Sequence, residues 1–320
     1  MAGPVPGHDV FRASHFRASH AIQSPRDGGA GGGVSYFLIQ TLNGVQYGFL
    51  LFLVASGLTL IFGIMGVINL AHGAFYMVGA YLAWWLAERT GSLFLAVVLA
   101  LPVTVLLGLA IERFGIRFLY DRDHMYQVLF TYGLILVLNE AQRVLFGNDV
   151  HGVQAPQWLA GTIPLSEAQT YPVYRLFISV ACVGVAGALY LLIQRTRLGM
   201  VIRAGSTHRE MVAALGFDIA RLFMAVFGLG AALAAFAGMV ASPVSTVYPG
   251  MGDNILILSF VVVVIGGIGS IKGAFAGAML VGVADTFGRV LLPTGAGVTV
   301  YAVMALVLLW RPQGLFGRTL

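Results

Sequence analysis

Long apolar blocks, separated by shorter polar or glycine-rich segments, make up most of this chain. About 20 consecutive apolar residues are what a helix needs to cross a bilayer. The pattern therefore predicts an all-α fold: a polytopic membrane protein whose helical bundle holds about 8–9 transmembrane helices. The blocks span residues 36–64, 68–87, 93–112, 126–146, 173–193, 221–242, 254–268, 273–292 and 297–310, and the first two are also compatible with three shorter or broken pieces.

The composition agrees with a chain surrounded by lipid. Of its 320 residues, 58% are apolar and 10% are charged, whereas a soluble domain carries about 25% charged residues. A net charge of +5 can indicate a nucleic-acid partner, but here the arginines cluster between the blocks, where the positive-inside rule accounts for them. We therefore expect membrane lipids, and no nucleic acid, around this chain. The single cysteine, Cys182, excludes an intrachain disulfide.

The loop charges also orient the chain. Alternation of the last seven blocks places the arginine-rich loops on one side, which the positive-inside rule makes cytoplasmic. These segments are 113–124, 195–220, 269–272 and the C-terminus. The opposite loops hold few cations, and the longest of them, 147–172, is the expected surface for an extracytoplasmic partner.

The N-terminal segment differs from the rest. Residues 1–33 are rich in glycine, arginine and histidine and contain the duplication FRASHFRASH from Phe11 to His20. They lack the apolar run of a secretory signal. We expect a disordered N-terminal tail over 1–33 and one transmembrane domain over 34–317.

The basic loop at 195–220 contains a short helix with both ends marked. Thr207 and Glu210 have the spacing of a capping box, in which both side chains satisfy free backbone N–H groups. Gly216 stands where a helix ends in a left-handed residue. The apolar residues between them are too few for a helix that is stable alone in water. The pattern predicts a cytoplasmic helix of about two turns, held by a partner outside the membrane.

Small residues recur at helical spacing in two places. Gly269, Gly273 and Gly277 follow one another at intervals of four, and Gly230 and Gly238 lie two such steps apart. Lipid tails give no hydrophobic drive between helices, so close backbone approach at small residues supplies packing energy. We expect helix packing at both series.

Ionisable side chains inside the blocks are few, and each costs about 2.5–3.5 kcal/mol on insertion scales. Glu140 stands three residues before Arg143, and Asp285 four before Arg289, so each pair shares one helix face. Two interpretations remain open. Glu140 and Asp285 belong either to a polar patch on a translocation path or, as we favour, to paired charges near the external end of a helix.

The segment 63–73 combines three glycines with Asn69 and His72, which predicts a break or sharp turn at membrane depth. Irregular backbone there requires protein or a water-filled cavity to satisfy it. Asn69 and His72 are therefore candidates for the path, although a lone histidine is more often a hydrogen-bonded structural residue. The sequence has no catalytic set, metal-site spacing or phosphate loop, so we expect neither enzyme activity nor a bound cofactor in this chain.

Two groups of motifs are informative together: GLTLIFG, VINLAHG and YMVGAY at 57–63, 67–73 and 76–81, and RLG, ALG and VVVVIGGIGS at 197–199, 214–216 and 261–270. They resemble branched-chain amino acid ABC transporter permeases of the LivH type, over about residues 36–317. Glu210 and Gly216 keep the six-residue spacing of the family's cytoplasmic motif, whereas Met211 and Val212 replace its two alanines.

The resemblance implies one permease subunit of an ATP-driven importer in the bacterial cytoplasmic (inner) membrane. Its implied partners are a second homologous permease subunit, two cytoplasmic ATPase subunits that use ATP and Mg²⁺, and an extracytoplasmic solute-binding protein. The short helix then becomes a coupling helix seated in an ATPase groove. The residues implied in coupling are Thr207, Arg209, Glu210, Ala214, Leu215 and Gly216.

Branched-chain or other apolar amino acids are the expected substrates, and urea or short amides are the alternative within the same family. A secondary transporter or channel is a further alternative, but it predicts an internal repeat with matching broken helices or mid-membrane acids. A membrane-embedded enzyme requires a reactive constellation that the sequence does not provide.

Overall fold

Helices account for nearly all of the computed structural model, which describes residues 30–166, 169–206 and 209–317. Each of the nine apolar blocks coincides with one helix. These helices are α1 (Ala30–Leu60), α2 (His72–Thr90), α3 (Leu93–Phe114), α4 (His124–Phe146), α5 (Val173–Arg195), α8 (Ile219–Ala241), α9 (Met251–Gly266), α10 (Ile271–Leu291) and α11 (Ala296–Trp310). In the described part, six of them have the length and apolar composition to cross a membrane: α1, α3, α4, α5, α8 and α10. The predicted polytopic, helical membrane architecture is therefore confirmed.

Shorter elements connect the long helices. Two short helices, α6 (Arg197–Gly205) and α7 (Arg209–Ala214), lie between α5 and α8. Three 3₁₀ turns occur at Ile116–Leu119, Gln157–Leu159 and Pro293–Gly295. Helix α1 begins at Ala30, inside the segment that the sequence predicted to be disordered, and the rest of that segment lies outside the described residues.

The long loop between α4 and α5 holds one element that the sequence did not predict, within an all-α architecture. Strands β1 (Thr162–Ser166) and β2 (Gln169–Pro172) form an antiparallel hairpin in which Thr162 lies opposite Pro172. The strands are short and lie outside the apolar blocks, so the hydrophobic pattern gives no signal for them. A backbone bridge between His151 and Val247 fastens the start of this loop to the α8–α9 connection.

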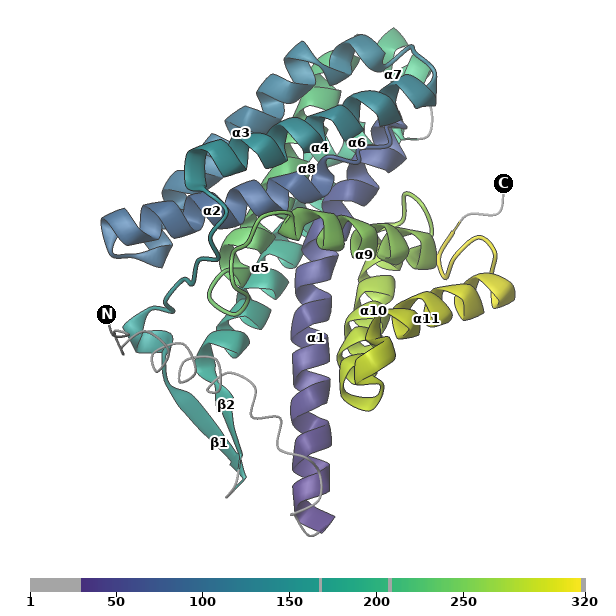
Figure 1. The fold of residues 1–320 in the computed structure, drawn as a ribbon. Helices are drawn as coiled ribbons and strands as arrows, with labels where there is room; N and C mark the ends of the chain where they lie inside the picture. The colour runs from purple at the N-terminus through teal and green to yellow at the C-terminus, as the bar shows by residue number, and fades with distance from the viewer. Residues whose placement is uncertain (1–29, 167–168, 207–208, 318–320) are drawn as a thin grey trace, which may run out of the picture.

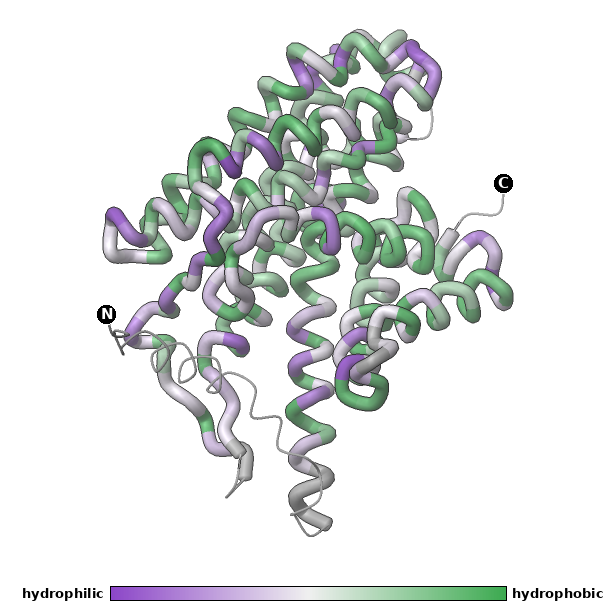
Figure 2. The backbone as a smooth tube through the Cα atoms, in the orientation of Figure 1, coloured by the Kyte–Doolittle hydropathy of each residue, from purple (hydrophilic) through white to green (hydrophobic). Residues whose placement is uncertain are grey.

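Helix α1 is the centre of the bundle. It packs against α10, α8, α9 and α5, and Figure 1 shows it between a tilted group formed by α2, α3, α4 and α8 and a second group formed by α9, α10 and α11. Figure 2 shows apolar residues along most helix faces, whereas polar residues gather at helix ends, in loops and along the N-terminal half of α1. Because α1 contacts four of the other long helices, most of its apolar C-terminal half is buried in protein.

Glycines let the helices around α1 approach one another closely. A Cβ atom added at Gly57 would lie 2.9 Å from the carbonyl oxygen of Gly230 on α8, and one at Gly44 would lie 2.9 Å from the Cα of Val283 on α10. An added Cβ at Gly238 would collide with the carbonyl oxygen of Tyr76 on α2. These positions therefore bring backbones together in the way that small residues do in membrane bundles.

The other glycine series is divided between two elements. Gly273 and Gly277 lie on α10 and face α9, where Cβ atoms would collide with the backbone of Gly266 and Val262. Gly269 precedes the helix, with φ of +78°, in the turn between α9 and α10. The interpretation of Gly269 as part of the same helical face is therefore wrong: its left-handed backbone makes the turn.

The predicted break between the first two blocks is present. A π-helical segment, Ile61–Met65, follows α1, and Gly66 ends it in the left-handed region with φ of +67°. The chain then turns and starts α2 at His72. The hydroxyl of Thr131 on α4 lies 3.4 Å from the carbonyl oxygen of Ile68 and 2.8 Å from that of Gln127 on its own helix, so α4 packs against the irregular backbone with a polar side chain.

Candidate functional sites

A cavity of about 670 Å³ with both polar and apolar lining lies among α1, α5, α9, α10 and α11, next to the ends of α2 and α8 and the α8–α9 connection. Sites for small ligands typically occupy about 300–1,000 Å³. On α1 the lining residues Gln40, Asn43 and Gln46 are spaced by three and so form one polar stripe down the helix. The stripe explains why the N-terminal half of this otherwise apolar helix carries amides.

Helix α10 contributes an ion pair to the cavity. Both carboxylate oxygens of Asp285 accept from Arg289, at 2.8 Å from Nε and 3.2 Å from Nη2. The side chain of Asp285 is 7% exposed and that of Arg289 is 65% exposed. The predicted pairing along one helix face is present, and the pair lines the cavity rather than a lipid-facing surface.

Helix α5 contributes a second cation, Arg175. Its Nη1 donates to Oδ1 of Asn43 at 2.6 Å, which joins the start of α5 to α1. Tyr174, the preceding residue, is buried and donates its hydroxyl to the carbonyl oxygen of Val240 at 2.9 Å. These two bonds fix the start of α5 against α1 and α8 and so hold the guanidinium at the cavity wall.

The other path candidates lie elsewhere. Asn69 and His72 are fully buried at the break between α1 and α2 and do not line the cavity. Nε2 of His72 is 3.0 Å from the carbonyl oxygen of Val54, which fits a structural histidine. Glu140 and Arg143 form a 3.7 Å pair on the surface of α4, with side chains 68% and 54% exposed. The structure therefore brings Asp285 to the cavity and separates it from Asn69, His72 and Glu140.

The segment between α5 and α8 holds α6 and α7, and Figure 1 shows α7 at one end of the tilted helix group. Thr196 caps α6 by accepting from the backbone N–H of Gly199 at 3.1 Å, and Arg203 donates to the carbonyl oxygen of Ile193 at the end of α5. The buried side chains of Ile202 and Val212 attach α6 and α7 to the bundle. Two buried apolar side chains, one on each short helix, thus hold this segment against the bundle.

Helix α7 presents an apolar surface away from the bundle. Met211 on α7 is exposed, as are Leu215 and Phe217 directly after the helix, and Glu210 and Ala214 on it. The helix is followed by Gly216 at φ of +86°, and the bonds Gly216 N to Ala213 O and Phe217 N to Val212 O form a Schellman cap. The left-handed glycine therefore lies where the sequence placed it. The expected capping box involves Thr207, which is outside the described residues, as is the side chain of Arg209.

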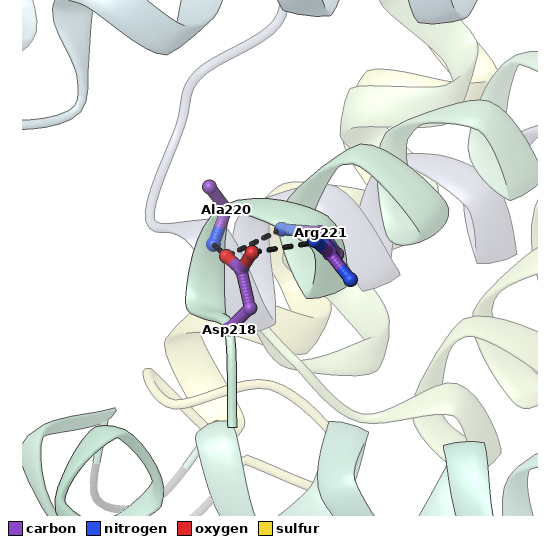
Figure 3. A network of polar contacts seen from close by, with 3 residues as sticks. All are labelled: Asp218, Ala220 and Arg221. Atoms are coloured by element: carbon purple, nitrogen blue, oxygen red, sulfur yellow. Dashed lines mark hydrogen bonds and ion pairs between the residues drawn. The ribbon is translucent and has the colours of Figure 1, made fainter. Parts of the chain in front are cut away.

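The N-terminus of α8, directly after this segment, is capped by a side chain. Oδ1 of Asp218 accepts from the backbone N–H groups of Ala220 at 3.0 Å and Arg221 at 3.1 Å. Oδ2 of the same carboxylate pairs with Nε of Arg221 at 3.0 Å (Figure 3). Asp218 thus caps the N-terminus of α8, which begins at the next residue, Ile219.

These features define the class of protein: a multi-pass helical membrane protein with a partly polar cavity within its bundle, as in membrane transporters. The family model for "Branched-chain amino acid transport system / permease component" matches residues 40–310. The chain therefore belongs to this family. The prediction of a transport permease, and not an enzyme, is confirmed by this membership.

Curated relatives agree over nearly the whole chain. The high-affinity branched-chain amino acid transport system permease protein BraD of Pseudomonas aeruginosa is 32% identical over 300 residues, which cover 89% of this chain and 97% of the relative. The corresponding permease protein LivH of Escherichia coli K12 is 30% identical over 299 residues, which cover 88% of this chain and 96% of the relative. A probable branched-chain amino acid transport permease protein LivH of Methanocaldococcus jannaschii is 26% identical over 290 residues, which cover 85% of this chain and 90% of the relative. A search of solved structures gave no significant match.

Sequence reasoning missed most of the cavity. It named Asp285 but not Asn43, Gln46 or Arg175. The spacing of the α1 amides was the available signal, because three polar residues on one face of an apolar helix mark a surface that does not meet lipid. The position of Arg175 had no such signal, since it depends on how α5 packs against α1.

Proposed function

We propose that the chain is a transmembrane permease subunit of an ATP-driven importer for branched-chain amino acids in the bacterial inner membrane. The family description and the names of its relatives support the substrate class. In this proposal all of the long helices cross the bilayer, including α2, α9 and α11, which gives the 8–9 spans that the sequence predicts.

The observation that carries the ATP-driven part of the proposal is the exposed apolar surface of α7. The arginine-rich loops and α7 lie on the same predicted cytoplasmic side, because loop cations follow the positive-inside rule. Exposed apolar residues on a short, anchored helix favour a protein partner there. We propose that α7 is the coupling helix, with Glu210, Ala214, Leu215 and Gly216 in contact with an ATPase and Thr207 and Arg209 at the start of the contact.

The mechanism follows from how α7 is attached. The Gly216 cap and the Asp218 cap join α7 to α8 within four residues, so closure of the ATPases around ATP and Mg²⁺ would move the start of α8. Helix α8 packs on α1 and α2 through glycines, and such contacts let helices slide or rotate as rigid bodies. The proposed outcome is alternating exposure of the path to the two sides of the membrane.

The remaining partners complete the proposal. A second homologous permease subunit supplies the other half of the path, and two ATPase subunits bind the nucleotide, so this chain holds no cofactor. A solute-binding protein delivers the substrate to the extracytoplasmic side, where the hairpin β1–β2 and its loop are the proposed contact. The cavity opens toward the same side, because Arg175 and the α10–α11 turn lie at the helix ends assigned outside.

Reconstitution of the whole transporter tests this function. Proteoliposomes that contain the chain, its second permease subunit and the ATPases would receive the solute-binding protein outside and ATP inside. We expect uptake of L-leucine that requires both ATP and the binding protein. Uptake of urea or acetamide in place of leucine would support the alternative substrate class, and uptake without any ATPase would overturn the importer.

A further inference from the structure

The cavity holds the cation Arg175, which forms no ion pair with a carboxylate among the described residues. Arg175 lines the cavity, and its described partner is the neutral amide of Asn43. Within residues 30–317 as described, the ion pairs involve Arg143, Arg221 and Arg289 but not Arg175. An amide fixes the guanidinium without neutralising it, so its charge remains available to an anionic group. Guanidinium groups favour carboxylates because they bind both oxygens at once.

The same cavity holds a fixed carboxylate. Asp285 is buried and oriented by two bonds from Arg289. A carboxylate has about four lone-pair positions, so it retains acceptor capacity toward a second donor. An ammonium group, with three N–H donors, is the compact cation that such a site accepts.

The rest of the lining supplies apolar surface. Leu50, Val244, Met251, Ile255 and Val300 lie around the same space. An isolated cation, an oriented carboxylate and apolar side chains in one cavity match the three parts of a free apolar α-amino acid. An uncharged solute such as an amide would leave the charge of Arg175 unbalanced.

We infer that this cavity binds a free apolar α-amino acid through its zwitterionic head group, with Arg175 on the carboxylate and Asp285 on the ammonium. Asn43 and Arg289 position these two groups. The inference rests on the proposed function, which makes the cavity part of the transport path. It adds that the permease itself recognises the head group, independently of the solute-binding protein.

The test measures ligand binding to the full chain in lipid nanodiscs, with no solute-binding protein and no ATPase present. Saturation-transfer NMR with L-leucine, up to millimolar concentrations, detects weak binding, and isothermal titration calorimetry detects tight binding. Two analogues separate the head-group contacts: 4-methylpentanoate lacks the ammonium, and 3-methylbutylamine lacks the carboxylate. The inference requires wild-type protein to bind leucine more tightly than either analogue.

Variants assign each contact. Arg175→Gln removes a charged hydrogen-bonding partner and should lower the affinity for leucine at least about tenfold. Arg175→Lys keeps the charge and should lower this affinity less. Asp285→Asn should lower the affinity for leucine but leave the affinity for 4-methylpentanoate unchanged. If Asp285→Asn alone fails to fold, the double variant Asp285→Asn, Arg289→Gln avoids leaving an unpaired arginine.

Arg89→Gln is the matched control, because Arg89 lies at the same predicted side but stacks on Trp85 at 3.9 Å, outside the cavity. It should bind leucine as the wild type does. Absence of leucine binding by the wild type, or unchanged binding by Arg175→Gln, would overturn the inference.

The two proposals fail in different ways. If the chain binds no leucine but the reconstituted transporter still imports it with ATP, the cavity assignment is wrong and the importer stands. If leucine binds through Arg175 but no ATPase associates with the chain, the cavity assignment stands and the ATP-driven function is wrong.

Discussion

Truncation of the exposed apolar side chains on α7 should weaken the binding of the ATPase without unfolding the permease. Met211 and Leu215 are 60% and 71% exposed, while the neighbouring Val212 is buried and anchors the helix. Alanine at both exposed positions keeps a good helix former in each place. The change therefore removes contact surface and leaves the fold intact.

The expected size of the effect follows from these exposures. Full burial of a Leu or Met side chain is worth about 1.5–3 kcal/mol, so burying the exposed two-thirds of each contributes about 1–2 kcal/mol. Alanine retains a small part of this, which leaves a loss of about 2–3 kcal/mol for the pair. Because 1.4 kcal/mol corresponds to a factor of ten, the dissociation constant should rise about 30- to 150-fold.

The assay is the affinity of purified ATPase for the permease in nanodiscs, measured by biolayer interferometry. Leu292→Ala is the control, because Leu292 is 58% exposed but lies at the opposite end of the bundle, in the α10–α11 turn. It should leave the affinity unchanged. Equal affinity for the α7 double variant and the wild type would refute the assignment of this surface.

Two further predictions concern the fold that supports the site. Asp218→Ala removes the cap of α8 and should lower the free energy of unfolding by about 1 kcal/mol, whereas Asp218→Asn, which keeps a capping oxygen, should lower it less; thermal unfolding in detergent distinguishes them. Gly238→Val drives a side chain into the carbonyl of Tyr76 and should lower the yield of folded protein in size-exclusion chromatography. Gly184→Val, at a position where an added Cβ meets no neighbouring atom, should not.

The helices were predictable because the bilayer constrains them strongly. A backbone in lipid must satisfy its own hydrogen bonds, so each long apolar block becomes a helix. The break after α1 was predictable for a local reason, since Gly66 supplies the left-handed residue that ends the π segment. Gly216 was predictable in the same way, as the end of α7.

What the sequence did not show depends on packing between distant elements. The cavity joins Asn43, Arg175 and Asp285 from three helices far apart in the chain, and no local pattern relates them. Asn69 and His72 were correctly placed at irregular backbone, but their side chains lie in the core, because α1 and α8 cover the break. The hairpin was not predicted, because its strands are too short to show an alternation of apolar and polar residues.

The central claim is that α7 is the surface through which this chain meets an ATPase, and crosslinking tests it most directly. Cys182 is the chain's one cysteine and is buried, so Cys182→Ser followed by Leu215→Cys gives a single reactive position on α7. A benzophenone maleimide at that position, photolysed in membranes that contain the whole transporter, should crosslink the chain to the ATPase subunit. Crosslinking to the extracytoplasmic solute-binding protein instead, or labelling of the cysteine by an impermeant reagent added outside intact cells, would contradict the account.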